Sequence, residues 1–283
     1  MREPTPTIRQ RKVARALRAW RNARDLKLKE VSARIGWSDA KISRLENAVT
    51  IAGPAEVIVL ATIYGISEAE RDEYVALAQN GDRVDWLRRF PADLVPGTLK
   101  DYIELEAEAT QLDNFETTIV PGLLQTERYA KAIARGWELR PSDDVVEDRT
   151  ALRVQRQARL QAERPLRLHA VIYEPGLRAP VGGTETMRAQ LLHLVEMAEL
   201  PNVTIQVLRA IGAHPAMGVS FCLLHLGEHT APVAYTDALT RGVFVEEEDD
   251  VERCRLTFQR LTELALEPQE SVDLIAQIAQ GHS

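Results

Sequence analysis

The chain has 283 residues, of which 45% are hydrophobic and 27% are charged, and its formal net charge is −7. This length and apolar content suffice for a large buried core and for two domains, which excludes a mainly disordered chain. Its two cysteines exclude a disulfide framework and a cysteine-based metal site, as is typical of a reducing compartment. No apolar run could span a bilayer, so we expect a soluble, cytoplasmic protein without a membrane partner.

Charge is distributed unevenly along the chain. Residues 1–50 hold 13 Lys and Arg against 5 Asp and Glu, a net of +8, which leaves 22 against 37, a net of −15, for residues 51–283. Because phosphate attracts basic groups, only the N-terminal part suits nucleic acid. We expect the acidic remainder to serve regulation or partner binding.

In chain order, a first helix is predicted over residues 8–24 and a helix-turn-helix over residues 28–47. Gly36 supplies the positive φ that ends one helix, and Ser38 caps the next, which would be the recognition helix. The apolar positions that would pack the two helices together are Val31, Ile35, Trp37, Ile42 and Leu45.

The outward face of this recognition helix carries the candidates for DNA contact. The spacing hides Ile42 and Leu45 and exposes Arg44, whose planar fork can bond two guanine acceptors at once. Lys27 and Lys29 lie where the preceding helix would cross the DNA backbone, so we assign them to phosphate. Lys41 could reach either a base or a phosphate. The remaining candidates are Ser38, Asp39, Ser43 and Asn47. For any one of these residues alone, a solvated helix face is the alternative.

Residues 13–66 resemble a lambda-repressor-like DNA-binding domain of the xenobiotic-response-element type. The segments that carry the resemblance are LRAWR at 17–21, EVSARIGWS at 30–38 and ISRLE at 42–46. It implies an ion pair between Glu46 and Arg21 of the first helix. Two positions depart from the family: Lys27 replaces a capping Ser or Thr, and Asp25 replaces a glycine with left-handed backbone. Each departure should cost on the order of 1 kcal/mol without changing the fold.

Two further helices are predicted over residues 54–64 and 67–79, because a proline starts the first and a Ser-x-x-Glu capping box starts the second. They complete a mainly α, five-helix DNA-binding domain over residues 1–80. Asn47 is expected to end the recognition helix in a left-handed conformation. Residues 81–98 are expected to form a linker.

Residues 99–283 are predicted to form an α+β domain in which helices flank a mixed sheet. Apart from a helix capped by Thr126, its expected helices are 97–112, 143–163, 184–199, 249–266 and 270–280. Its expected strands are 115–120, 166–174, 203–208, 219–226, 233–237 and 242–246. This domain is also expected to dimerise.

The segment FETTIVPGLLQTERYA at 115–130 resembles the signature of the large domain of unknown function in actinobacterial WhiJ-like regulators. The likeness extends over roughly residues 99–278. Such regulators are described as antitoxin-like or developmental transcription factors, often encoded beside a small acidic partner protein, so the resemblance implies such a partner. Leu123, Leu124 and Tyr129 are weak candidates for binding it, because apolar residues of this kind more often belong to a core.

Residues 225–229, HLGEH, match the His-x-x-Glu-His pattern of some zinc peptidases, which need both histidines on one helical face. A strand pattern precedes this motif and Gly227 interrupts it, so we predict a polar hairpin turn instead. Glycines at 182–183 lack the lysine of a phosphate loop, and the acidic run at 246–250 suits a helix N-terminus. We therefore assign no catalytic residue, metal or cofactor, and expect that the chain is not an enzyme.

The sequence thus predicts a sequence-specific transcription regulator that binds double-stranded DNA as a homodimer, because one recognition helix touches only a few base pairs. Two other functions remain open. The chain could be an antitoxin that mainly neutralises its small partner, which co-purification would reveal. Its C-terminal domain could be a hydrolase, for which metal analysis should find stoichiometric zinc.

Overall fold

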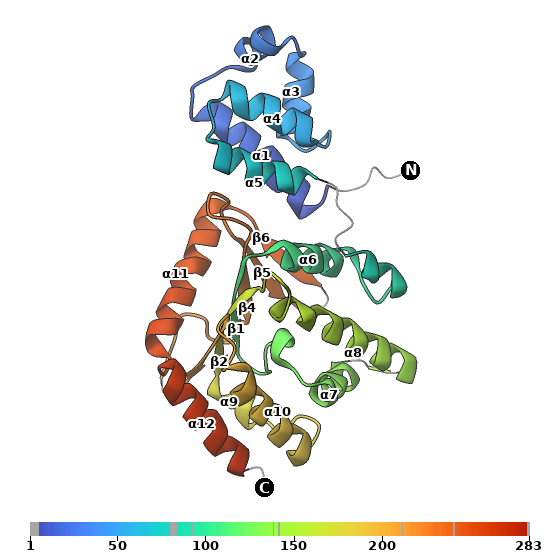
Figure 1. Ribbon diagram of the computed structural model, residues 1–283, viewed down its shortest axis with the longest axis vertical. Helices are drawn as coiled ribbons and strands as arrows, with labels where there is room; N and C mark the ends of the chain where they lie inside the picture. The colour runs from blue at the N-terminus through green and yellow to red at the C-terminus, as the bar shows by residue number, and fades with distance from the viewer. Residues whose placement is uncertain are drawn as a thin grey trace. The chain divides into compact units, whose positions relative to one another are not determined.

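The structure of the protein is a computed structural model. The residues it describes are 6–79, 84–91, 93–137, 139–140, 142–210, 212–239 and 241–281. It divides the chain into two compact units (Figure 1): unit 1 comprises Met1–Arg83 and Leu226–Ala231, and unit 2 comprises Val84–His225 and Pro232–Ser283. The beginning of the expected linker, at 81–83, lies outside the described residues.

Unit 1 is helical, as the sequence predicted. The helices among its described residues are α1 (Ile8–Asn22), α2 (Leu28–Ile35), α3 (Asp39–Glu46), α4 (Pro54–Ile63) and α5 (Glu68–Ala78). Ser67 caps α5 by accepting a hydrogen bond from the Glu70 amide at 3.2 Å. The expectation for Asn47 is wrong: its φ is −109°, and Ala48, with φ at 55°, takes the left-handed conformation instead.

The core of unit 1 joins α1 to the four helices that follow. Leu17, Val31 and Leu60 are fully buried. Trp20 of α1 meets Tyr74 of α5 edge to face, with ring centroids 4.9 Å apart, and its indole Nε1 donates to Glu70 Oε1 at 2.7 Å. Such aromatic pairs stabilise a fold by more than the apolar area they bury. The contact with Tyr74 therefore helps α1 to hold the unit together.

Unit 2 is an α+β fold with a six-stranded mixed sheet in the order β3-β2-β1-β4-β5-β6, again as predicted. The strands are β1 (Gln111–Glu116), β2 (Arg167–Tyr173), β3 (Val203–Leu208), β4 (Phe221–His225), β5 (Val233–Asp237) and β6 (Gly242–Val245). The helices of its described part are α6 (Gly97–Glu108), α7 (Glu127–Trp137), α8 (Asp143–Gln157), α9 (Glu174–Arg178), α10 (Thr184–Met197), α11 (Glu248–Leu264) and α12 (Pro268–Gly281). Short 3₁₀ turns lie at Asp85–Arg89, Gly122–Leu124 and Ala158–Leu160. None of the described helices is long and apolar enough to cross a bilayer.

Strand direction places several strand ends at one edge of the sheet. β1, β2 and β3 are mutually parallel, whereas β4 runs antiparallel to β1 and β5 antiparallel to β4. The carboxyl ends of β1, β2, β3 and β5 therefore share an edge with the start of β4. Glu116, the last residue of β1, lies at this edge, where its register partner in β2 is Ile172.

The two faces of the sheet differ in chemistry, because successive side chains of a strand alternate between them. On one face Phe115, Phe221 and Phe258 of α11 form an apolar cluster. The other face carries Cys222 and Tyr235 opposite α6, whose Tyr102 ring lies 4.5 Å from that of Tyr235. Figure 1 shows α11 on one side of the sheet and α6 with α8 on the other.

The strand predicted over residues 115–120 is wrong. β1 begins at Gln111, four residues earlier, and the helix predicted to continue to 112 ends at Glu108. Asp113 and Asn114 are buried in β1 because β4 supplies their partners: the side chain of His225 lies 2.7 Å from Asp113 Oδ2, and the Phe221 carbonyl lies 3.4 Å from Asn114 Nδ2. The β-branched run that suggested a strand is the loop after β1.

The α9 helix, which the sequence did not predict, brings β2 close to this loop. A side chain at Gly176 would place its Cβ 3.1 Å from the carbonyl carbon of Thr118 and 3.2 Å from the amide nitrogen of Ile119. These contacts are with backbone, which cannot rotate away. Any other residue here would need this backbone to give way by a few tenths of an ångström, so glycine suits this close approach.

Candidate nucleic-acid interface

The turn between α2 and α3 is closed by short polar contacts. Gly36 ends α2 with φ at 72°, as predicted. The Ser32 hydroxyl donates to the Trp37 carbonyl at 2.6 Å, and Ser38 caps α3 by accepting from the Lys41 amide at 3.2 Å. These bonds satisfy polar groups of the turn and of the first turn of α3, so they fix the angle between the two helices.

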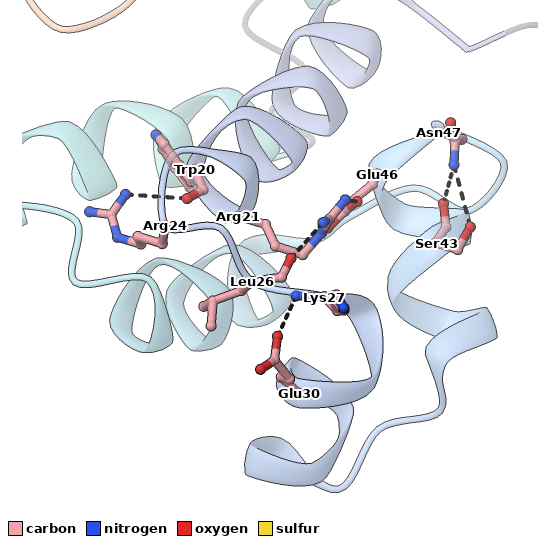
Figure 2. A network of polar contacts seen from close by, with 9 residues as sticks. All are labelled: Trp20, Arg21, Arg24, Leu26, Lys27, Glu30, Ser43, Glu46 and Asn47. Carbon is pink, nitrogen blue, oxygen red and sulfur yellow. Dashed lines mark hydrogen bonds and ion pairs between the residues drawn. The ribbon is translucent and has the colours of Figure 1, made fainter.

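A buried ion pair holds α3 to α1 (Figure 2). Arg21 donates from Nε to Glu46 Oε1 at 2.7 Å and from Nη2 to Glu46 Oε2 at 2.8 Å, and its Nη1 donates to the Leu26 carbonyl at 2.8 Å. The side chains are 13% and 3% exposed. The hydrogen bond to Glu46 raises the pKa of Arg21. This two-point contact orients α3 as well as attaching it.

The outward face of α3 presents Arg44 to solvent. Ile42 and Leu45 are 0% and 1% exposed and belong to the core. Ser43 is half-buried and Arg44 is exposed. Within the described residues, the Arg44 guanidinium makes no hydrogen bond or ion pair, so its donors are available to an acceptor outside the chain.

Asn47 and Ser43 form a pair at the far end of α3 (Figure 2). Asn47 Nδ2 donates to the Ser43 carbonyl at 2.7 Å and lies 3.4 Å from the Ser43 hydroxyl. Asn47 itself is exposed, and its side-chain carbonyl oxygen is not used in either contact. The amide nitrogen of Asn47 is thus held against Ser43 at the end of α3.

Lys41 is engaged within the chain, which the sequence analysis missed. Its ammonium lies 3.9 Å from the centroid of the Trp37 ring and 3.4 Å from Glu56 Oε1. The sequence signal was Trp37 itself, four residues before Lys41, since residues at this spacing lie near one another when a turn leads into a helix. Lys41 is therefore less available for DNA than Arg44. Asp39, in the same turn of α3, is half-buried.

The start of α2 presents the two lysines assigned to phosphate. Lys27 and Lys29 are both exposed. The Lys27 side chain does not cap α2, but the Glu30 carboxylate accepts from the Lys27 amide at 2.7 Å (Figure 2). Asp25 has φ at 52°, the left-handed conformation expected there. The lysine ammonium groups and the free backbone amides at the N-terminus of α2 together suit a phosphate oxygen.

The weak candidates in unit 2 lie inside it. Leu123, Leu124 and Tyr129 are 3%, 0% and 0% exposed, so they contribute to the interior. The HLGEH motif, 225–229, begins at the last residue of β4 and continues into the turn before β5, so its histidines do not share a helical face. Within the described part of the chain, no three histidine, cysteine or carboxylate side chains gather as metal ligands do.

Two family models match the chain. The model of a helix-turn-helix domain matches residues 12–74, and the model of a domain of unknown function, DUF5753, matches residues 99–277. Comparisons with curated proteins and with solved structures found no match. The first match contains α2, the turn and α3, and the second contains the whole sheet.

Proposed function

The chain belongs to the family defined by the domain of unknown function DUF5753, and we propose that it is a sequence-specific transcription regulator of the lambda-repressor-like, WhiJ-like type. The observation that carries the proposal is Arg44, which is exposed, has no side-chain partner among the described residues, and lies on a helix that the pair of Arg21 and Glu46 orients from behind. A guanidinium presented in this way can read a guanine in the major groove. Lys27 and Lys29 would hold the adjacent phosphates.

The regulator acts as a homodimer. One recognition helix covers too few base pairs for useful specificity, so two copies would contact half-sites separated by about 34 Å, one turn of DNA. Unit 2 supplies the dimer contact and receives the effector, whether a small acidic partner protein or a small molecule. The chain works by binding and not by catalysis, in the cytoplasm where its DNA lies.

The test begins with genome-wide mapping of bound DNA, followed by gel-shift titration on the recovered site. We expect affinity to fall steeply with salt, because each phosphate contact releases counterions. Arg44→Ala should reduce the preference for that site over random DNA by roughly 10- to 100-fold while leaving weak nonspecific binding. Arg188→Ala, which removes an exposed arginine of α10, is the matched control and should change neither value.

Full site preference in the Arg44→Ala variant would remove Arg44 from base recognition. Binding that shows neither site preference nor salt dependence in the wild-type chain would overturn the proposal as a whole.

A further inference from the structure

Two arginines one turn apart on α8 are treated differently by their surroundings. Arg156 donates from Nε and Nη2 to the two oxygens of Glu106 at 2.8 and 2.7 Å, with side chains 12% and 2% exposed. Arg153 forms no such pair: within the described residues, its guanidinium donates only from Nη1 to Gln125 Oε1, at 2.8 Å. One guanidinium is closed on a carboxylate, and the other keeps free donors.

Arg153 is nonetheless held in place. Gln125 is fully buried, and its Nε2 donates to the Val120 carbonyl at 2.7 Å. The main-chain carbonyl of Gln125 accepts from Gln157 Nε2 at 2.6 Å. The loop after β1 therefore holds the Gln125 carboxamide that accepts from Arg153, and the end of α8 holds the Gln125 backbone.

Two carboxylates belong to the same electrostatic environment without touching Arg153. Glu116 ends β1 and Asp237 ends β5, both at the shared edge of the sheet, and alternation places both on the face of Tyr235. The Tyr235 hydroxyl donates to Asp237. No ion pair joins Arg153 to either carboxylate within the described residues.

The pKa values reflect this unpaired state. Burial raises the pKa of Glu116 to about 7, against hydrogen bonds from Ser220 and Asn114 and the attraction of Arg153, while Asp237 raises it further. Burial also lowers the pKa of Arg153 to about 10. Within the described residues these opposite charges make no direct ion pair, so their hydrogen-bonding capacity remains for one group that would satisfy both.

Access and charge define what could enter. Glu116, Arg153 and Ser220 are half-buried and Asp237 is exposed, so water reaches the cluster. Open sheets with parallel strands bind ligands at this edge, beyond the carboxyl ends of the strands. Two carboxylates against one guanidinium would repel a simple anion, and a simple cation would leave the donors of Arg153 unsatisfied. A molecule with one charge of each sign meets both requirements.

We propose that Glu116, Arg153 and Asp237, supported by Asn114, Ser220 and Gln125, bind a free α-amino acid. Its carboxylate accepts from the free donors of Arg153, as carboxylates accept from arginine guanidinium groups in other proteins, and its ammonium donates to Glu116 and Asp237. This amino acid would be the small-molecule effector of unit 2. Its binding is independent of the proposed function, and only its effect on DNA binding rests on that function.

The test is calorimetric and thermal titration of the full chain with each of the twenty proteinogenic amino acids. At least one should bind and, at about a hundred times its Kd, raise the melting temperature of unit 2 by roughly 5–10 °C. The N-acetyl derivative and the carboxamide of that amino acid each lack one charge and should bind at least tenfold more weakly.

Four variants locate the site. Arg153→Gln and Glu116→Gln should each weaken amino-acid binding at least tenfold, with the fold checked by circular dichroism. Arg153→Lys, which keeps the charge but loses the fork, should lie between wild type and Arg153→Gln. The matched control is the double variant Arg188→Gln/Glu185→Gln, which removes exposed charges of α10 and should bind as wild type does.

Absence of binding by all twenty amino acids to the folded chain would overturn this inference, as would equal binding by the N-acetyl derivative or by the Arg153→Gln variant. DNA binding is measured separately on the same samples. Amino-acid binding without a specific DNA site would support this inference and overturn the proposed function. Specific DNA binding without amino-acid binding would support the proposed function and overturn this inference.

Discussion

The two units handle charge in opposite ways. Unit 1 closes its buried pair, Arg21 with Glu46, and leaves Arg44 in solvent. In unit 2, Arg156 of α8 is paired with Glu106 of α6, whereas Arg153 of the same helix makes no ion pair within the described residues. DNA is large, so side chains that read its major groove must project from the protein surface. A small molecule is instead bound by side chains that surround it. The difference fits the two proposed binding functions, one for DNA and one for a small molecule.

The largest effect should come from breaking the closed pair of unit 2. Arg156→Met leaves Glu106, which is 1% exposed, without its partner and should destabilise unit 2 by about 3–5 kcal/mol in urea unfolding. The double variant Glu106→Leu/Arg156→Met removes both charges and should recover most of that loss. A loss below about 1 kcal/mol in the single variant would show that water reaches the pair, and the contrast with Arg153 would disappear.

The equivalent change in unit 1 should be somewhat smaller. Arg21→Met should destabilise unit 1 by about 2–3 kcal/mol, because Arg21 is 13% exposed and its partner Glu46 keeps some access to solvent when α3 loosens. Tryptophan fluorescence of Trp20 should report this unfolding, and affinity for the mapped DNA site should fall with it. Arg18→Met, at an exposed position of α1, is the control. Unchanged DNA affinity would mean that the pair attaches α3 without orienting it.

A third prediction concerns pH. The folded pKa of Glu116, about 7, lies above its ordinary value of 4.5, so the folded state holds a proton that the unfolded chain releases. The contribution of Glu116 to wild-type stability should therefore fall as pH rises from about 4.5 to 7 and level off above it, by at most about 3.5 kcal/mol at 1.4 kcal/mol per pKa unit.

Glu116→Gln removes this titration, so its stability relative to wild type should increase between pH 5 and pH 8 in parallel urea titrations. Glu185→Gln, an exposed position of α10, should leave the pH profile as it is. If the Glu116→Gln and wild-type curves ran parallel, Glu116 would be as hydrated as a surface carboxylate. If Glu116→Gln were more stable than wild type and also lost amino-acid binding, Glu116 would be a binding residue that lowers the stability of the folded state.

The smallest effect should come from the cap of the recognition helix. Ser38→Ala removes the acceptor of the Lys41 amide and should destabilise unit 1 by about 1 kcal/mol, measured by thermal unfolding. Ser38→Asp keeps a capping oxygen and should retain stability close to that of wild type. Equal loss in both variants would indicate that Ser38 acts through something other than its cap.

The sequence predicted what depends on neighbouring residues. The turn at Gly36, the cap at Ser38 and the hidden positions Ile42 and Leu45 are set within a dozen residues, and the structure has all of them. The position of β1 was mispredicted because its polar residues are satisfied from far along the chain. Asp113 meets His225, 112 positions away, and no local pattern announces that partner.

The open cluster of unit 2 could not be predicted for the same reason. Glu116 precedes Arg153 by 37 positions along the chain, and Asp237 follows much later, so only the order of the strands brings them to one edge. The character of Arg153 depends on Gln125 within a loop that looked like a strand followed by a turn. Its neighbour Arg156 has the same residue type on the same helix, so composition alone does not distinguish them.

Gly176 gives this arrangement an unexpected point of vulnerability. Its missing side chain lets α9 lie against the backbone at Thr118 and Ile119, just before the loop segment that carries Gln125. A methyl group there would lie 3.1 Å from the carbonyl carbon of Thr118, so the loop would have to shift by a few tenths of an ångström, and we expect the carboxamide that accepts from Arg153 to move with it. Substitutions should thus be tolerated better at exposed residues near the cluster than at Gly176. A screen for variants that lose the ligand response should recover Gly176, although this residue would not contact the ligand.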